Sequence, residues 1–457
     1  MANTVAKYQT YTEYKESGVE WLGEIPRHWD SKPLKYLCTY NDEVLPETTA
    51  KDAEIQYIDI GSVSAVNGIS KIETMIFKDA PSRARRIVRD GDVIVSTVRT
   101  YLEAIAPINN PPENLIVSTG FAVIRPNQYL YKSFASYCLR AKGFIKEVVA
   151  RSVGVSYPAI NSSDLVNIAI PSIEYAEQVK IANFLDHETT KIDHLIEKQQ
   201  QLIELLKEKR QAVISHAVTK GLNPDVNMKD SGVEWLGEVP EHWIVAGFKK
   251  YLSSIVDYRG KTPEKVDEGI FLVTARNIKK GKIDYSLSQE YVSDNDYDQI
   301  MSRGSPLIGD VLFTTEAPLG EVSQVDRTDI ALAQRIIKFR GQDNVLDNTF
   351  LKFFMMSTSF QDSLMTFASG STALGIKAER LGYLKQLIPP LNEQQEIVKH
   401  IEKCVHQFDG LEKKMRDAIS LMQERRTALI SAAVTGKIDV RNWQAPTLAG
   451  AQTELSA

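Results

Sequence analysis

Residues 15–29 read KESGVEWLGEIPRHW, and residues 229–243 read KDSGVEWLGEVPEHW, with twelve of the fifteen positions identical. A second pair of similar segments follows, because residues 177–219 align without a gap with residues 393–435. Repetition at a fixed offset is typical of a chain built from copies of one structural unit. The sequence is therefore one unit written twice. Each copy has a short opener, a divergent region and a long segment rich in charged residues.

The long segments are predicted to be helices that form a coiled coil. They contain no proline, and Gly410 is their only glycine. Apolar residues recur at alternating steps of four and three, which is the spacing of a coiled-coil seam. The seam predicted for the first helix is Ile181, Leu185, Glu188, Ile192, Leu195, Gln199, Leu202, Leu206, Lys209 and Val213. The seam predicted for the second is Ile397, Ile401, Cys404, Phe408, Leu411, Met415, Ala418, Met422 and Leu429.

The order of segments predicts how these helices run. The first helix leads from one divergent region to the other, so a second helix that pairs with it must run back. We therefore expect an antiparallel pair with one globular domain at each end, related by a pseudo-twofold axis. The first opener should then lie at the end of the second helix, with Trp21, Leu22 and Trp29 sealing it.

The divergent regions are predicted to be α+β domains, because short β-branched runs alternate with turn residues and helical stretches. Strands are expected at 56–60, 93–98 and 121–124, then at 270–274, 311–315 and 336–339. Helices are expected at 132–149, 162–166 and 348–367. The expected segments are an N-terminal segment with the opener (1–30), domain 1 (31–171), helix 1 (172–220), linker and second opener (221–243), domain 2 (244–390), helix 2 (391–438) and a flexible tail (439–457).

Composition limits the function classes. With 43% hydrophobic and 25% charged residues among 457, the chain has the composition of a soluble globular protein. It contains no apolar run long enough to span a membrane and no signal peptide, and its three cysteines are far apart, so we expect a cytoplasmic protein with no metal site. The net charge of -5 does not favour nucleic acid. Local basic clusters, such as Arg83 to Arg89 and Lys279 to Lys282, still permit contact with phosphates.

The duplicated SGVEWLGE(I/V)P-x-HW opener resembles the entry segment of the specificity subunits of type I restriction-modification systems. The segment IPPLNEQQEI at 388–397 and the helix end ERRTALISAAVTGKI at 424–438 are also similar to that family. The resemblance implies a non-catalytic subunit with two target-recognition domains, each reading half of a bipartite site in double-stranded DNA. It also implies that the helices dock two methyltransferase subunits and that endonuclease/translocase subunits join them. S-adenosylmethionine, ATP and Mg would belong to those partners.

Base edges are read by arginine, lysine, asparagine, glutamine, serine and threonine, whereas phosphate contacts position the protein. We expect DNA contacts from polar loops of the divergent regions. The candidates are Arg83, Arg85, Arg86, Arg99, Tyr101, Tyr157, Arg276, Asn277, Lys279, Lys280, Arg335, Ser371 and Thr372.

Two motifs approximate catalytic signatures without matching them. Asn110-Pro111-Pro112-Glu113 lacks the aromatic residue with which adenine methyltransferases stack on a flipped base. The segment 370–377 lacks the Lys-Ser/Thr ending of a phosphate-binding loop. A methyltransferase or nuclease acting alone is therefore disfavoured. A coiled-coil scaffold with two protein-binding heads remains the alternative.

Overall fold

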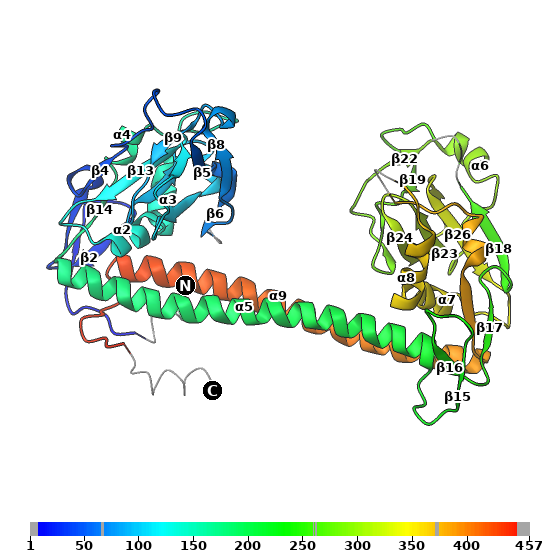
Figure 1. The fold of residues 1–457 in the computed structure, drawn as a ribbon. Coiled ribbons are helices and arrows are strands. Elements are labelled where there is room, and N and C mark those ends of the chain that lie inside the picture. The colour runs from blue at the N-terminus through cyan, green and yellow to red at the C-terminus, as the bar shows by residue number, and fades with distance from the viewer. Residues whose placement is uncertain (1–7, 65–67, 259, 261–262, 371–373, 446–457) are drawn as a thin grey trace. The chain divides into compact units, whose positions relative to one another are not determined.

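The computed structural model describes residues 8–64, 68–258, 260, 263–370 and 374–445. The chain divides into two compact units, Met1–Gln199 with Arg416–Ala457, and Gln200–Met415. The units do not follow the linear order of the predicted segments, because both long helices are shared between them. Helix α5 (Tyr175–Lys220) leaves the first unit and ends in the second, and α9 (Leu391–Val434) returns (Figure 1).

The first divergent region folds as an α+β domain with two four-stranded sheets. One sheet has the strand order β11 (Ile105–Pro107), β10 (Val93–Ser96), β13 (Phe121–Pro126) and β4 (Cys38–Tyr40). The other has the order β8 (Glu73–Ile76), β5 (Glu54–Ile58), β12 (Leu115–Ser118) and β9 (Ala84–Ile87). Ile94 and Phe121 of the first sheet share a buried apolar cluster with Val117 of the second. The predicted strands are therefore present, with shifted ends.

The second divergent region repeats this arrangement. One sheet has the order β18 (Leu252–Asp257), β26 (Ile336–Gly341), β23 (Val311–Thr315) and β24 (Leu319–Gln324). The other has the order β22 (Tyr291–Val292), β19 (Ile270–Val273) and β25 (Ile330–Leu332). Smaller pairs in the chain are β1 (Tyr14–Glu16) with β2 (Glu24–Pro26), β6 (Val63–Ser64) with β7 (Gly68–Ile69), β15 (Met228–Asp230) with β16 (Glu238–Pro240), and β20 (Ile278–Lys279) with β21 (Lys282–Ile283). The α+β class is confirmed.

Each domain also carries a pair of helices where one long helix was predicted. These are α2 (Lys132–Leu139) and α3 (Lys142–Ala150), then α7 (Asn348–Met356) and α8 (Thr358–Phe367). The first domain also contains the short helix α4 (Ser162–Leu165), and the second contains α6 (Tyr297–Ile300). The break in the second domain has a local cause, because buried Ser357 is extended and its hydroxyl accepts a hydrogen bond from the Phe360 amide. A serine in this position starts a new helix.

Strand pairs tie the domains to the long helices. In the first unit β3 (Asp30–Pro33) pairs with β14 (Ala169–Ser172), and in the second β17 (Ile244–Gly247) pairs with β27 (Lys385–Ile388). In each pair, the strand that follows an opener lies beside the strand that precedes a long helix. Gln178 then closes the junction of the first unit. Its side chain accepts a hydrogen bond from the Tyr131 amide at 2.8 Å and donates to the Tyr129 carbonyl at 2.9 Å.

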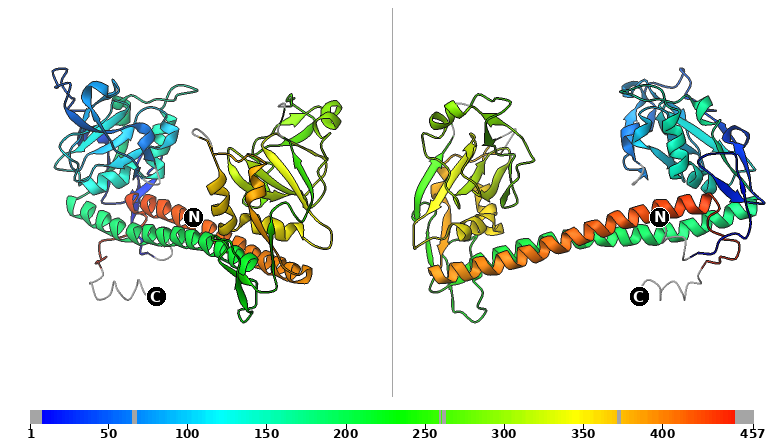
Figure 2. Two further views of the ribbon diagram at one scale, coloured as in Figure 1. Left: turned by 45° about the vertical axis from the view of Figure 1, so that its right-hand side comes forward. Right: turned by 180° about the vertical axis from the view of Figure 1, so that it is seen from behind.

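The two long helices run antiparallel within each unit (Figures 1 and 2). In the first unit Ile192 of α5 and Leu429 of α9 share one buried core, and Arg426 pairs with Asp193. In the second unit Ile214 and Ile401 share another core. The predicted antiparallel pairing is confirmed for each unit. The placement of the two domains at opposite ends of the pair stays a prediction.

The predicted seam is wrong at several positions in the middle of the helices. Leu195 and Leu202 were expected in the seam, yet they are 49% and 42% exposed. The neighbouring Ile203 is only 5% exposed, and Ile196 packs against the core of the first unit. Leu411, 42% exposed, shows the same shift in α9. The error arises because apolar residues stand side by side here, so spacing alone does not decide which one faces the partner helix.

The first opener seals the end of α9 through Leu22 and Trp29, as predicted, but not through Trp21. Trp29 and Leu22 are buried in one cluster with Ala433 and Val434 at the end of α9. A Cβ atom at Gly436 would lie 3.1 Å from the Trp29 ring, so glycine permits this close approach. Trp21 packs instead against the domain, where its indole nitrogen donates to the Ala169 carbonyl at 2.9 Å.

The C-terminal segment is ordered for longer than predicted. Val440, placed in the flexible tail, is 1% exposed, and the Trp443 ring lies 5.6 Å from the Phe184 ring. Apolar packing on α5 explains this order, so the expected tail is wrong for residues 439–443. The remainder, residues 446–457, lies outside the described residues.

Candidate nucleic-acid interface

Within the described residues, each domain has one pair of adjacent parallel strands. β5 pairs in parallel with β12, with Tyr57 opposite Ile116, and β19 pairs in parallel with β25, with Leu272 opposite Ala331. The segments that follow two adjacent parallel strands leave the sheet side by side, at its carboxyl edge. Such edges are frequent binding sites in α/β sheets. In the second domain β19 and β22 lie on the side away from the long helices (Figure 1).

The segments after β19 and β25 line a cleft in the second domain. Its volume is about 180 Å³, and it is lined by Arg276 and Arg335 of the predicted set together with Lys265, Glu290 and Gln334. Lys265 pairs with Glu290 at 2.8 Å. The Nε atom of Arg335 lies 2.8 Å from a Glu316 oxygen. The prediction did not include Lys265, Gln334 and Glu316, although Gln334 adjoins Arg335 in the sequence.

The first domain brings three predicted residues close together. The Arg99 guanidinium lies 5.0 Å from the centre of the Tyr157 ring, and Tyr101 is 53% exposed two residues after Arg99. The Tyr157 loop is held by hydrogen bonds between Val153 and Ala159 at 2.8 and 3.0 Å. Stacking on an aromatic ring fixes the plane of a guanidinium group. This surface therefore offers an oriented cation beside exposed aromatic rings.

The three remaining arginines of the predicted set in the first domain lie on or beside strand β9 (Ala84–Ile87). Arg83 is exposed, and its carbonyl accepts a hydrogen bond from the Thr119 amide directly after β12. Arg85 packs 4.7 Å from the Phe77 ring centre. Arg86 is half-buried, its Nε atom has no hydrogen-bond partner in the described structure, and burial lowers its pKa. Among Arg83, Arg85 and Arg86, only Arg83 has an exposed side chain, and it lies beside the carboxyl end of β12.

Asn277 is a correction to the predicted set. Its side chain is fully buried, and its oxygen accepts from the amide and the hydroxyl of Thr274, both at 2.9 Å. Its amide nitrogen donates to the carbonyls of Asp284 and Leu287. These bonds use both ends of the amide, so Asn277 holds the turn after β19 and does not face a base.

The basic hairpin β20–β21 does not line the cleft. Lys279 and Lys280 are exposed, but neither lines the cleft of Arg276. The hairpin reaches the helix pair instead, because Lys282 lies 3.4 Å from Asp409 of α9. Ser371 and Thr372 lie outside the described residues, so their predicted contacts remain predictions.

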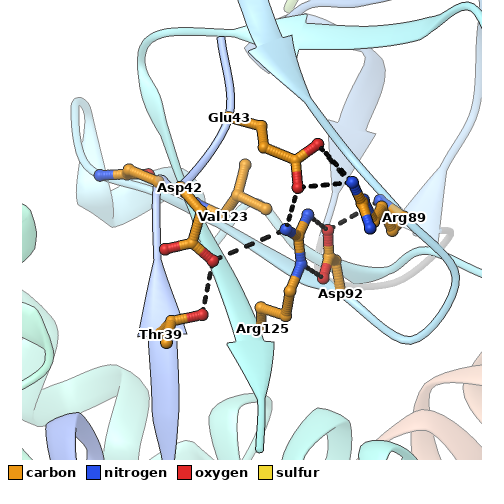
Figure 3. A network of polar contacts seen from close by, with 8 residues as sticks. Thr39, Asp42, Glu43, Arg89, Asp92, Val123 and Arg125 are labelled. Carbon is orange, nitrogen blue, oxygen red and sulfur yellow. Dashed lines mark hydrogen bonds and ion pairs between the residues drawn. The ribbon is translucent and has the colours of Figure 1, made fainter.

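Buried carboxylates hold the frame of both domains. Asp92, 1% exposed, accepts hydrogen bonds from the Arg125 guanidinium at 2.8 and 2.9 Å (Figure 3). Burial would raise the pKa of Glu43, but hydrogen bonds from Arg125 and Arg89 outweigh it and lower the pKa. In the second domain, fully buried Asp310 lies 2.9 Å from Lys338. These charged clusters are internal pairs that orient strands.

The described residues offer neither a metal site nor a membrane-spanning helix. No cluster of three or more histidine, cysteine, aspartate or glutamate side chains there has an arrangement that could bind a metal ion. None of the described helices has both the length and the apolar character required to cross a membrane.

Two copies of one fold on shared helices, with different residues at equivalent strand ends, define a class of protein that presents two distinct binding surfaces. The chain belongs to the type I restriction modification DNA specificity domain family, which matches residues 26–205 and 264–421. This membership supports DNA reading over the scaffold alternative.

The chain matches several relatives over most of its length and of theirs. A putative type I restriction enzyme MjaX specificity subunit from Methanocaldococcus jannaschii is 24% identical, over 94% of this chain and 98% of that protein. The type I restriction enzyme EcoKI specificity subunit from Escherichia coli K12 is 22% identical, over 93% and 92%. A chain solved in work on complex assembly and conformational transition of the type I R-M system superposes with a TM-score of 0.68 at 22% identity, over 91% and 99%. This likeness confirms the fold.

Proposed function

We propose that this chain is the non-catalytic DNA-reading subunit of a type I restriction-modification complex and that each domain reads one half of an asymmetric, interrupted site. One observation supports this most strongly: the domain frame is repeated, whereas the residues at the carboxyl ends of the parallel strands differ. Arg276 follows β19, and Gly61 stands at the equivalent place after β5. Two different readers on one frame suit two different half-sites.

The partner subunits supply the chemistry in this proposal. Two methyltransferase subunits dock on the helices, and endonuclease/translocase subunits join that core. S-adenosylmethionine, ATP and Mg bind to those subunits, and the complex acts in the cytoplasm. The specificity subunit contributes position, because it decides where on the duplex the methyltransferases are held.

Exposed leucines on the long helices support two equivalent docking sites. Leu195 and Leu205 of α5 are 49% and 58% exposed, and Leu411 and Leu421 of α9 are 42% and 68% exposed. The second pair stands 216 residues after the first, the offset of the repeat. Leu195 and Leu421 belong to the first unit, and Leu205 and Leu411 to the second. Exposed apolar side chains that recur by symmetry indicate a repeated protein interface.

DNA binding by the assembled complex tests the function. We expect the chain with its methyltransferase subunits to bind one duplex sequence far more tightly than a scrambled duplex. The affinity should fall steeply with added salt, because phosphate contacts release counterions. Equal affinity for both duplexes at every salt concentration would contradict the proposal.

Stoichiometry tests the docking sites. Replacing Leu195 and Leu421 by aspartate should leave a complex with one methyltransferase subunit, because only the first unit is altered. The same change at Leu205 and Leu411 should remove the other subunit, and Asp417→Ala, at an exposed position of α9, should remove neither. Mass photometry counts the subunits. Two bound subunits in both leucine variants would place the docking surface elsewhere.

A further inference from the structure

The cleft of the second domain differs from the equivalent place in the first at two defined positions. The parallel strand pairs of the two domains have the same register. Gln56 lies opposite Leu115 in the first domain, and Phe271 lies opposite Ile330 in the second. Both strands of the second pair stand 215 residues after those of the first. By that register Arg276 corresponds to Gly61 and Arg335 to Gly120.

Backbone hydrogen bonds support the second correspondence. The Thr315 amide donates to the Arg335 carbonyl at 2.8 Å, and the Thr97 amide donates to the Gly120 carbonyl at 2.8 Å. The two domains thus share this backbone hydrogen bond, although φ is positive at Arg335 and not at Gly120. A side chain at this place in the first domain would require Ile60 to shift, because a Cβ atom on Gly120 would lie 2.5 Å from the end of the Ile60 side chain.

The second domain holds Arg335 in place. Its φ angle is +77°, a conformation that few residues other than glycine adopt and that costs energy. Its Nε atom lies 2.8 Å from a Glu316 carboxylate oxygen, and its side chain is about half exposed. The guanidinium group is a planar fork of donors, and the carboxylate beside it restrains its orientation. Arg276 is exposed and lines the same cleft.

The charges around the cleft favour a base edge over a phosphate. Glu290 lines the cleft, and Glu316 contacts Arg335 beside it. The two carboxylates offset two of the three cations Lys265, Arg276 and Arg335, which reduces the attraction of the cleft for a phosphate, whereas a base edge is uncharged. The guanine edge in the major groove offers two acceptors, N7 and O6, and a planar arginine fork pairs with both. Lysine has the same charge but not this geometry.

We propose, on the basis of the proposed DNA-reading function, that Arg276 and Arg335 read guanine in the half-site of the second domain. The first domain makes no such contact at the equivalent positions, because Gly61 and Gly120 stand there. These two arginines are therefore specificity-determining residues that separate the two readers.

Modified DNA tests the proposal directly on the unaltered complex. The recognition site is first mapped by sequencing methylated bases in a host that carries the complex. Each guanine in the half-site of the second domain is then replaced by 7-deazaguanine, which lacks the N7 acceptor. We expect at least one such duplex to bind roughly 5- to 20-fold more weakly, because one of two hydrogen bonds is lost. A half-site without guanine, or one insensitive to every replacement, would overturn the proposal.

Variants then assign the contact to a residue. Arg335→Lys and Arg276→Lys should each weaken binding to the natural site roughly 5- to 100-fold. Each variant should also be insensitive to 7-deazaguanine at the position that the missing fork read. Arg327→Lys, which alters an arginine paired with Asp329, should behave as wild type.

Two outcomes separate the proposals. If both lysine variants keep the full sensitivity to 7-deazaguanine, another residue reads guanine and this inference is wrong. If the wild-type complex binds all duplexes equally, the proposed function itself fails.

Discussion

The Asp193 carboxylate of α5 lies 2.8 Å from the Arg426 guanidinium of α9. The repeat places Asp409 and Arg210 at the corresponding positions, and these two side chains lie 2.5 Å apart. The residue numbers of both pairs have the same sum, which is the relation that antiparallel helices in one register require. The same ion pair therefore occurs in both copies of the repeat. The positions of its residues show that the two helices are antiparallel.

A charge swap tests this ion pair. Asp193→Arg should lower stability by about 1 kcal/mol, because it replaces a partly exposed attraction by repulsion. Combining it with Arg426→Asp should restore most of the loss, since the pair is re-formed in reverse. Thermal unfolding measures both, and Asp417→Arg, at an exposed position of α9, is the control. A double variant no more stable than Asp193→Arg would show that the two side chains do not interact.

Neighbouring apolar residues test the corrected seam. Ile203→Ala should destabilise the protein by roughly 2–4 kcal/mol, because its side chain is 5% exposed and its removal leaves a cavity. Leu202→Ala should cost about 0.5 kcal/mol, because Leu202 is 42% exposed. Thermal unfolding compares the two variants. Equal losses would argue for the seam predicted from spacing alone.

The two glutamates at the helix starts should differ in their contribution to stability. Glu177 accepts hydrogen bonds from the Trp29 indole at 3.2 Å and the Tyr11 hydroxyl at 2.7 Å, and both donors are buried. Glu393 accepts from the Trp243 indole at 3.1 Å and is more exposed. Glu177→Ala should therefore destabilise by about 2–4 kcal/mol, more than Glu393→Ala, because two buried donors lose their acceptor.

Glutamine is the control for this comparison. Glu177→Gln keeps an oxygen acceptor and should recover part of the loss in the same unfolding experiment. If Glu177→Ala and Glu177→Gln lowered the stability equally, the Glu177 oxygens would not stabilise the opener as acceptors.

We expect the largest losses of stability when buried charged residues are replaced. Asp310→Asn should destabilise by about 3–5 kcal/mol, because Lys338, whose side chain is 5% exposed, loses its counter-ion. Asp92→Asn should cost less, since Arg125 keeps Glu43 at 2.7 Å. Asp329→Asn, at an exposed pair, serves as the control. If thermal unfolding gives all three variants the same midpoint, these carboxylates do not stabilise the domains.

Repetition made most of the fold predictable from the sequence. The openers, the α+β domains and the antiparallel helices follow from segments that recur at fixed offsets. A polar junction recurs in the same way. Gln394 bonds to the Asp347 amide and the Val345 carbonyl, both at 2.8 Å, as Gln178 does to the equivalent atoms of Tyr131 and Tyr129.

The rest depended on three-dimensional contacts. Ser357 divides a helix through one hydroxyl contact, and a buried turn uses both ends of the Asn277 amide. Neither effect has a periodic signal. The same limit applies to the candidate site. Arg276 and Arg335 were selected for their residue type, but the strand register brings them together and shows that glycines replace them in the other domain.

The most direct test of two independent readers is a domain exchange followed by mapping of methylated bases. Residues 31–169 are replaced by the equivalent region of a relative with a different recognition site, and the exchanged chain is expressed with its partner subunits. We expect one half of the recognition site to change to that of the donor, while the other half and the spacing between them stay as in the wild type. A site altered in both halves, or in neither, would contradict the assignment of one half-site to each domain.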